Sequence, residues 1–333
     1  MQTNQVGGRL IGEGVYGCIF DPAPRCAGGS VFKRIGKMRT VGKITSEYAD
    51  DELGIGKAIM HLPLATQYFA LPSIGCKAPP VIDDPEVEDC KLLKKEKKDL
   101  TLLIMPAAGE TIHAWSKNRA RLAEKFVFMM KHLLEGMVIY QRAGYIHNDI
   151  HYKNILVDEF DVPRYIDFGL GFKLDRVNRW EDANIGYSFK PAYIFMPPEL
   201  HIWRGIKNGV SVRDAVRELK DIHQEYRQIE KAWGSADDIL YEFSQMSKCF
   251  RERDGVTFIR TYARAFDVWR IGMFFWMMWN DLLFWTPFKE SALYAERDRV
   301  VPIMKGLVHF SPARRYTAEK ALLELDPRNR LVS

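Results

Sequence analysis

The sequence lacks the cysteine patterns and leader segments that mark several classes of protein. Its five cysteines form no C-x-x-C pair and no cluster with histidine at zinc spacing. Because their number is odd and no pairing is apparent, reduced thiols in a reducing compartment are the simplest interpretation. The N-terminus shows no basic region followed by an apolar run, so no signal peptide is expected. These absences together predict a cytoplasmic protein.

Long apolar runs and an excess of one charge are missing as well. The most hydrophobic segment, 266–285, is interrupted by charged residues, and its longest apolar stretch is nine residues. A helix needs roughly 20 apolar residues to cross a bilayer, so we expect a buried core helix and no membrane contact. The net charge of +5 is small for 333 residues, and binding to nucleic acid is not indicated.

The residues that are present favour strands in the first third of the chain and helices thereafter. The glycine-rich segment 9–20, followed by the apolar start of 31–33, predicts strand, turn and strand. Segment 45–60 predicts a helix, and in 119–142 apolar residues recur on one helical face. We therefore expect an α+β protein with a small β-rich part and a larger helical part.

The strongest chemical signal lies between residues 147 and 169. Asp149, Asn154 and Asp167 fall close together in the sequence, each beside apolar residues that would anchor a loop. Magnesium prefers hard oxygen ligands and usually takes one or two from the protein, with phosphate and water completing its shell. Asn154 and Asp167 fit that requirement, which leaves Asp149 free to accept a proton.

With these residues the chain resembles the protein kinase family, and seven motifs follow in the family's order. They are Gly12-x-Gly14-x-x-Gly17, Val31-Phe32-Lys33, His147-x-Asp149-x-x-x-x-Asn154, Asp167-Phe168-Gly169, Met196-Pro197-Pro198-Glu199, Asp267-x-Trp269-x-x-Gly272 and Ser311-Pro312-x-x-Arg315-x-Thr317. The resemblance implies a protein-kinase-like bilobal fold, ATP and Mg²⁺ as cofactors, and serine or threonine hydroxyls of protein substrates as acceptors.

The resemblance implies a nucleotide site that begins in the small lobe. Lys33 would hold the α- and β-phosphates and pair with a helix glutamate, which is Glu52 by the apolar pattern, or Glu47 as the fallback. Because Pro106 has no N–H, only the Met105 carbonyl and the Ala107 N–H could bond the base. The nucleotide contacts that the resemblance implies besides Lys33 are Gly12, Glu13, Gly14, Gly17, Ile19, the gatekeeper Ile104, Met105, Ala107, Glu110 and Asn154.

The resemblance also implies the catalytic and metal-binding residues. Asn154 and Asp167 would hold Mg²⁺, and Asp149 would orient the substrate hydroxyl and accept its proton. Glu199 and Arg315 should form a buried salt bridge that ties the end of the activation segment to the helical lobe.

Three positions depart from the family pattern. Asn148 replaces the arginine that usually precedes the catalytic aspartate, so we expect activity without phosphorylation of Ser188 or Tyr193 in the activation segment. His151 stands where a lysine is usual, and the pattern D-x-H-x-x-N also resembles aminoglycoside and choline kinases. Gly56 stands where a bulky apolar residue is expected, so either the helix register is off or this helix is loosely held.

The fourth departure is a long segment, 201–262, which is mixed in charge and helix-prone. We expect a helical insert that packs on the helical lobe; the alternative is a docking surface for a substrate or partner. The expected lobes are then residues 1–107, with the glycine-rich loop, and residues 108–333, with the catalytic loop, the activation segment and the insert.

Two other classes of function stay open. A small-molecule phosphotransferase is the alternative that His151 suggests, although Asp167-Phe168-Gly169 favours protein substrates. A pseudokinase scaffold would lack an essential group, whereas Lys33, Asp149, Asn154 and Asp167 are all present. The motifs are also similar to those of divergent serine/threonine kinases encoded by large DNA viruses, which would place the protein in the host cytoplasm or the virion.

Overall fold

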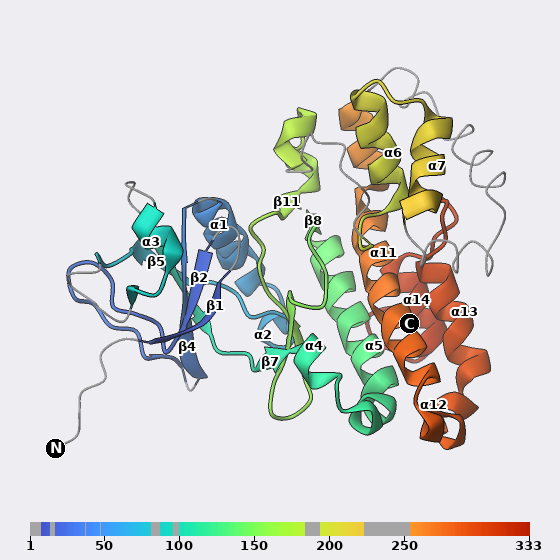
Figure 1. Cartoon of the computed structure of the whole chain (residues 1–333), viewed down its shortest axis with the longest axis horizontal. Helices are drawn as coiled ribbons and strands as arrows, with labels where there is room; N and C mark the ends of the chain where they lie inside the picture. Colours follow the sequence, from blue (N-terminus) through green and yellow to red (C-terminus); the bar gives the residue numbers. More distant parts are fainter. Residues whose placement is uncertain are drawn as a thin grey trace. The chain divides into compact units, whose positions relative to one another are not determined.

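The computed structural model describes most of the chain (Figure 1). The described residues are 8–13, 17–36, 38–46, 48–80, 87–95, 100–183, 194–222 and 254–333. They divide into two units, which we describe separately. The strand-rich unit comprises residues 1–109 and 164–170, and the helical unit comprises residues 110–163 and 171–333. The α+β content expected from the sequence is confirmed.

The division differs from the expected one in two respects. The first boundary follows Gly109 instead of residue 107, and the segment Arg164–Leu170 returns to the strand-rich unit. That return depends on backbone contacts: the Ala70 N–H donates to the Tyr165 carbonyl at 3.0 Å, and Phe69 forms a parallel bridge with Tyr165. Because such contacts join residues far apart in the chain, the sequence pattern did not reveal them.

An antiparallel sheet forms the centre of the strand-rich unit. Its strands are β1 (Arg9–Glu13), β2 (Gly17–Asp21), β3 (Arg34–Ile35), β4 (Met38–Thr45), β5 (Ile74–Lys77) and β6 (Thr101–Pro106). Their order is β1-β2-β4-β6-β5, with β3 paired to β4, so β4 lies at the centre. Helices α1 (Ala49–Met60), α2 (Ala65–Tyr68) and α3 (Lys91–Lys95) complete this unit.

Two disulfide bonds cross-link the strand-rich unit. Cys18 bonds to Cys90, and Cys26 bonds to Cys76, across 72 and 50 positions of sequence. The expectation of reduced thiols is therefore wrong for these four residues, while Cys249 lies outside the described residues. The sheet brings the partners together, and cysteine spacing could not show that. The buried members of the surrounding apolar cluster are Cys18, Phe20, Ala23, Cys26, Ile44, Ala78, Val87, Cys90, Leu100, Leu102 and Ile104.

Helices make up most of the helical unit. They are α4 (Ile112–Trp115), α5 (Arg119–Arg142), α6 (Pro198–Lys207), α7 (Val212–Ile222), α11 (Gly255–Leu283), α12 (Ala292–Ala295), α13 (Arg297–Leu307) and α14 (Ala318–Leu325), with 3₁₀ turns η2 (Leu174–Arg176), η3 (Trp180–Ala183) and η4 (Thr286–Glu290). The short strands are β7 (Glu110–Thr111), β8 (Tyr145–Ile146), β9 (Ile155–Val157), β10 (Pro163–Tyr165) and β11 (Phe172–Lys173). The first unit boundary after β9 falls inside β10.

Helix α5 follows its sequence pattern closely. The Asn118 side chain caps its start by accepting from the Arg121 N–H at 3.1 Å. The helix ends just before Gly144, whose φ of +84° lies in the left-handed region that glycine tolerates best. The apolar face predicted from Leu122 to Met137 is buried.

Helix α11 contains the segment expected to be a buried core helix, and that expectation is confirmed. It lies beside α5 (Figure 1), where the Phe126 ring packs against Phe275 and Trp279 with ring centres 5.3 and 5.7 Å apart. Among the helices that the structure describes, none combines the length and the apolarity needed to cross a bilayer.

The described part of the segment 201–262 packs on the helical unit. Helix α7 lies against α6, and its Ala215 and Val216 are fully buried or nearly so. The described residues of this segment are thus helical and packed, as expected, while its identity as an insert stays a prediction. Residues 223–253 lie outside the described residues.

Candidate active site

A lysine and two carboxylates meet in the strand-rich unit. Lys43 lies on the central strand β4, Glu52 lies on α1, and Asp167 follows β10. The Lys43 Nζ is 2.7 Å from Glu52 Oε2 and 2.7 Å from Asp167 Oδ1. The Glu52 side chain is 1% exposed and that of Asp167 is 39% exposed. The glutamate is therefore enclosed, while the aspartate keeps access to solvent.

Lys43, not Lys33, makes the ion pair expected of the phosphate-binding lysine. Lys33 precedes the two-residue strand β3, and its side chain is exposed. The expected pairing of Lys33 with a helix glutamate is wrong, because the chain passes through β3 and a further turn before the long strand β4 begins. The apolar neighbours Val41 and Ile44 were the sequence signal that could have placed Lys43 on a strand.

Burial and charge act in opposite directions on this cluster. Burial alone would lower the pKa of the Lys43 ammonium, but the carboxylates of Glu52 and Asp167 outweigh it and hold that pKa above its ordinary value. Burial raises the pKa of Glu52, the attraction of Lys43 opposes it, and the nearby charge of Asp167 adds to it. Lys43 therefore stays cationic at neutral pH and offers a fixed positive charge to an anion.

Helix α1 packs closely at Gly56. A Cβ on this residue would lie only 2.4 Å from the Pro72 carbonyl oxygen, so a glycine is required for this approach. Glu52, Gly56 and Ile59 are all buried on the same helix. Because Glu52 pairs with Lys43, the helix has the expected register, and the shifted register offered for Gly56 is wrong. That the helix is loosely held stays a prediction. Phe168 is buried all the same, with its ring 6.1 Å from that of Phe69.

The glycine-rich segment forms a hairpin as expected. Gly12 lies on β1 and Gly17 on β2, and the two strands pair antiparallel. A Cβ on Gly17 would lie 2.6 Å from the Ile44 carbonyl oxygen, so this glycine lets β2 approach β4. Gly14, between the two strands, lies outside the described residues.

Two further residues of the hairpin have defined neighbours. Glu13 accepts from the Lys91 Nζ at 2.8 Å and from the Lys91 backbone N–H at 3.1 Å, so its carboxylate is engaged with the start of α3. Ile19 is the cross-strand partner of Lys43. Because paired residues of an antiparallel sheet project from the same face, Ile19 lies beside the lysine as an apolar neighbour.

The residues expected at the hinge occupy the end of β6. Ile104 and Met105 are buried. The Ala107 N–H donates to the Arg39 carbonyl at 2.8 Å, so this donor is engaged within the sheet and would have to exchange that bond to contact a base. Glu110 lies on β7 in the helical unit, where it is exposed.

In the helical unit, Asp149 and Asn154 are joined directly. The Asn154 Nδ2 donates to the Asp149 backbone carbonyl at 2.8 Å and to Asp149 Oδ2 at 2.9 Å. These bonds use the donor end of the amide, which leaves Oδ1 as the hard oxygen ligand that Mg²⁺ prefers. His151 Nε2 lies 3.7 Å from Asp149 Oδ2. The donor set therefore fits the metal-binding role expected of Asn154.

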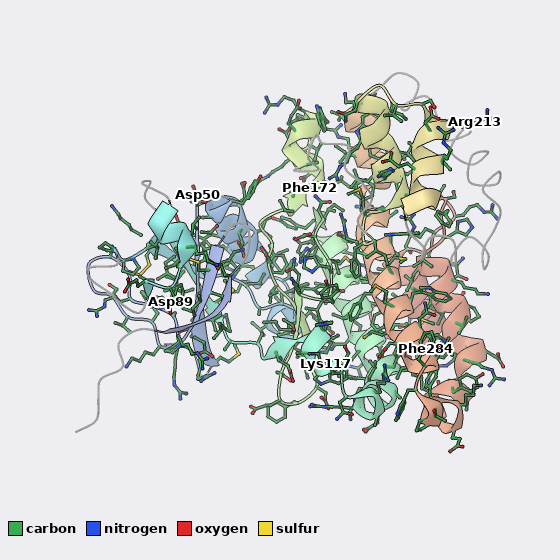
Figure 2. The ribbon with its side chains drawn as sticks, in the orientation of Figure 1. Asp50, Asp89, Lys117, Phe172, Arg213 and Phe284 are labelled. Atoms are coloured by element: carbon green, nitrogen blue, oxygen red, sulfur yellow. A yellow bond between two sulfur atoms is a disulfide. The ribbon has the colours of Figure 1, made fainter. Side chains whose placement is uncertain are left out.

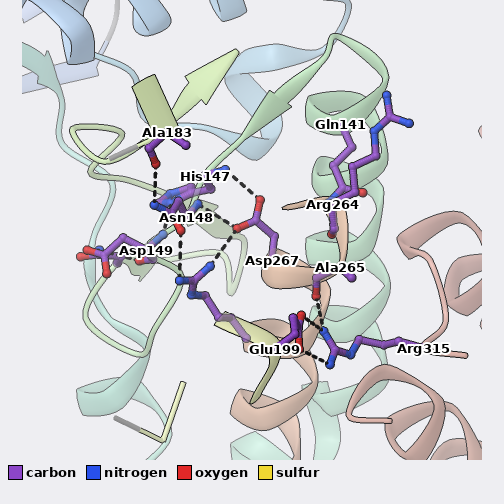
Figure 3. A network of polar contacts seen from close by, with 12 residues as sticks. Gln141, His147, Asn148, Asp149, Ala183, Glu199, Arg264, Ala265, Asp267 and Arg315 are labelled. Atoms are coloured by element: carbon purple, nitrogen blue, oxygen red, sulfur yellow. Dashed lines mark hydrogen bonds and ion pairs between the residues drawn. The ribbon is translucent and has the colours of Figure 1, made fainter. Parts of the chain in front are cut away.

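A buried carboxylate holds the loop that carries Asp149 (Figure 3). Asp267, on α11, accepts from the backbone N–H groups of His147 and Asn148, each at 2.8 Å. Burial raises the pKa of Asp267 to about 6, although Arg270 and the two N–H groups pull it downward. The chain segment just before Asp149 is therefore fixed to the core helix.

Arg270 is a residue that sequence reasoning missed. Its Nη2 donates to Asn148 Oδ1 at 3.2 Å, and its Nη1 lies 3.6 Å from Asp267 Oδ1. Asn148 has a φ of +62°, a left-handed conformation that asparagine tolerates better than most residues. The guanidinium of Arg270, on α11, thus contacts the side chain of Asn148. Its place within the motif that begins at Asp267 was the available sequence signal.

The predicted salt bridge between Glu199 and Arg315 is confirmed (Figure 3). Arg315 Nη1 and Nη2 donate to the two Glu199 carboxylate oxygens at 2.7 and 2.9 Å, and Nη1 also donates to the Ala265 carbonyl at 2.8 Å. Both charged groups are completely buried. Three segments far apart in the sequence are joined at this point.

Three residues singled out in the sequence, Glu47, Ser188 and Tyr193, lie outside the described residues. Activity without phosphorylation of the activation segment stays a prediction.

A scan against models of protein families finds no match to this chain, and a search of curated proteins finds none either. The function of the chain must therefore be inferred from its motifs and from the geometry described above.

Proposed function

We propose that the chain is an ATP-dependent protein kinase that transfers the γ-phosphoryl group of Mg-ATP to serine or threonine hydroxyls of protein substrates. The observation that carries the proposal is the cluster of Lys43, Glu52 and Asp167 in the strand-rich unit. A strand lysine paired with a helix glutamate, together with an aspartate that binds metal, is the arrangement protein kinases require. A kinase-like bilobal fold is part of the same proposal.

The proposed reaction gives each group one task. Lys43 holds the α- and β-phosphates, and Glu52 fixes the position of its ammonium. Asp167 and Asn154 offer oxygen ligands to Mg²⁺, which offsets charge on the triphosphate. Asp149 orients the acceptor hydroxyl and takes its proton while the new O–P bond forms and the bond from the γ-phosphorus to the bridging oxygen of ADP breaks.

The location and origin of the protein also belong to the proposal. Structural disulfides persist mainly in oxidising compartments, so the two bonds in the strand-rich unit do not favour the cytoplasmic location expected from the sequence. The similarity to kinases of large DNA viruses, with the virion as a location, is supported by the motifs alone.

The proposal is tested by incubating the purified protein with Mg²⁺, γ-labelled ATP and a mixture of protein substrates, with Asp149→Asn measured in parallel. We expect label on serine and threonine of protein, and a loss of about 10²–10⁴-fold in rate in the variant, the usual contribution of a positioned general base. Phosphoamino-acid analysis of the product identifies the acceptor.

Two results would contradict the proposal, and each points to a different function. Label on small molecules such as aminoglycosides or choline, with none on protein, would identify a small-molecule phosphotransferase. Saturable ATP binding with no transfer above the Asp149→Asn level would identify a scaffold.

A further inference from the structure

A groove of about 530 Å³ opens on the helical unit beside the loop that carries Asp149. It is formed by the end of α4 and the turn after it, the start of α5, the last third of α11, and two side chains from loops, Tyr152 and Phe195. Its floor is apolar, since Leu122, Phe274 and Met278 line it and are buried. The groove lies entirely within the helical unit.

A series of rings connects this groove to the catalytic loop. The ring of Tyr152 lies 5.1 Å from that of His113 and 5.8 Å from that of Phe195. Tyr152 follows Asp149 by three positions in the same loop, so their Cα atoms are at most about 11 Å apart, the reach of three residues. A polypeptide whose hydroxyl reached Asp149 would therefore pass within a few residues of the groove.

The charges around the groove select for an acidic partner. Asp281, the carboxylate that lines it, is engaged by Arg119 through two hydrogen bonds of 3.0 and 2.7 Å. Lys117, in the turn that follows α4 (labelled in Figure 2), is exposed, and no carboxylate among the described residues pairs with it. The rim therefore carries positive charge that the described protein leaves unneutralised.

We propose that this groove binds the substrate polypeptide and selects a bulky apolar side chain next to an acidic residue. The apolar side chain enters the floor between α5 and α11, and the acidic residue lies against Lys117. This inference rests on the proposed kinase function, because it names the substrate class of that activity. It also predicts peptide binding in the absence of phosphoryl transfer, so the two can be tested apart.

The test measures binding of fluorescein-labelled peptides to the full-length protein by anisotropy, without ATP. Three peptides contain a central serine and differ only in flanking pairs placed on both sides of it: Phe-Glu, Phe-Lys or Ser-Glu. We expect the Phe-Glu peptide to bind tightest. In Lys117→Glu, the attraction between residue 117 and the glutamate of the peptide becomes repulsion. This change should lower the affinity for the Phe-Glu peptide by about tenfold, and the variant should prefer the Phe-Lys peptide instead.

The matched control is Lys289→Glu, a charge reversal at an exposed lysine that does not line the groove. It should leave the order of the three peptides unchanged. Equal affinity of the three peptides for the wild-type protein would overturn the inference. So would an unchanged preference in Lys117→Glu.

A second measurement separates this inference from the proposed function. The rate of ATP hydrolysis without peptide should be equal in wild type and Lys289→Glu, because Lys289 is assigned neither to ATP nor to the groove. If the predicted peptide preference is found but no label is transferred to the peptide's serine, the groove assignment stands and the kinase assignment fails. If label is transferred to the serine without the predicted peptide preference, the kinase assignment stands and the groove assignment fails.

Discussion

In the strand-rich unit two disulfide bonds join segments 72 and 50 positions apart, whereas the helical unit has a single cysteine, Cys249, and cannot form one internally. The helical unit joins its distant segments through buried aromatic packing and the enclosed Glu199–Arg315 pair. The first unit has short strands and a small apolar cluster, while the second has helices of 24 and 29 residues. A small core gains more from covalent cross-links, because it buries less apolar surface.

The tryptophans allow this difference to be measured. All eight lie at residue 115 or beyond and within the helical unit. Tryptophan fluorescence therefore reports unfolding of the helical unit alone, and hydrogen exchange of the amides in β2, β4 and β6 reports the strand-rich unit. The two units can be followed separately in one sample.

The largest expected effect is the loss of both disulfides. We expect Cys18→Ser combined with Cys26→Ser to lower the free energy of opening the sheet by several kcal/mol, since each closed loop of this length is worth about 4 kcal/mol. Hydrogen exchange in β2, β4 and β6 should accelerate strongly, while the midpoint of the tryptophan transition stays the same. Equal destabilisation of both units would contradict the comparison.

The second effect concerns the helical unit. Arg315→Ala leaves Glu199 buried and unpaired, and we expect a loss of about 3–5 kcal/mol, seen as an earlier tryptophan transition in denaturant. The matched control is Arg142→Ala, which breaks the half-exposed pair with Glu319, where the side chains are 52% and 50% exposed. That change should cost less than about 1 kcal/mol. Similar costs for the two variants would show that burial is not what makes the Glu199 pair important.

The smallest effect comes from two glycines on α1. Gly56→Ala drives a methyl group toward the Pro72 carbonyl, and overpacking of this kind costs about 1–3 kcal/mol. Gly54→Ala meets nothing within 4 Å and should stabilise the helix by up to about 1 kcal/mol. Hydrogen exchange of α1 should change in opposite directions in the two variants. A stabilising Gly56→Ala would mean that α1 is loosely held after all.

The sequence predicts those parts of the structure that depend on local pattern. Helix α5 is one, because its apolar period, its Asn118 cap and Gly144 all lie within one segment. Local pattern does not predict the disulfide partners, because the register of the sheet brings them together. The contact between Arg270 and Asn148 likewise joins residues 122 positions apart.

The lysine of the candidate site also could not be predicted from local sequence pattern. Lys33 lies two residues after Val31 and Lys43 two residues after Val41, and this local pattern alone does not separate them. The choice is made by the register of β4, which places Lys43 between β2 and β6 and within reach of Glu52. The proximity of Asp149 and Asn154 was easier to predict, because they lie five positions apart in one loop.

The measurement that tests the account most directly compares Lys43→Met with Lys33→Met in the rate of phosphoryl transfer from γ-labelled Mg-ATP. We predict that Lys43→Met lowers kcat/KM by about 10²–10³-fold, the usual cost of one preorganised charge at a reacting phosphate, and that Lys33→Met changes it less than about twofold. Hydrogen exchange in β2 and β6 confirms that the sheet stays folded in both variants. Full activity in Lys43→Met with a folded sheet, or a large loss in Lys33→Met, would contradict the assignment of the site.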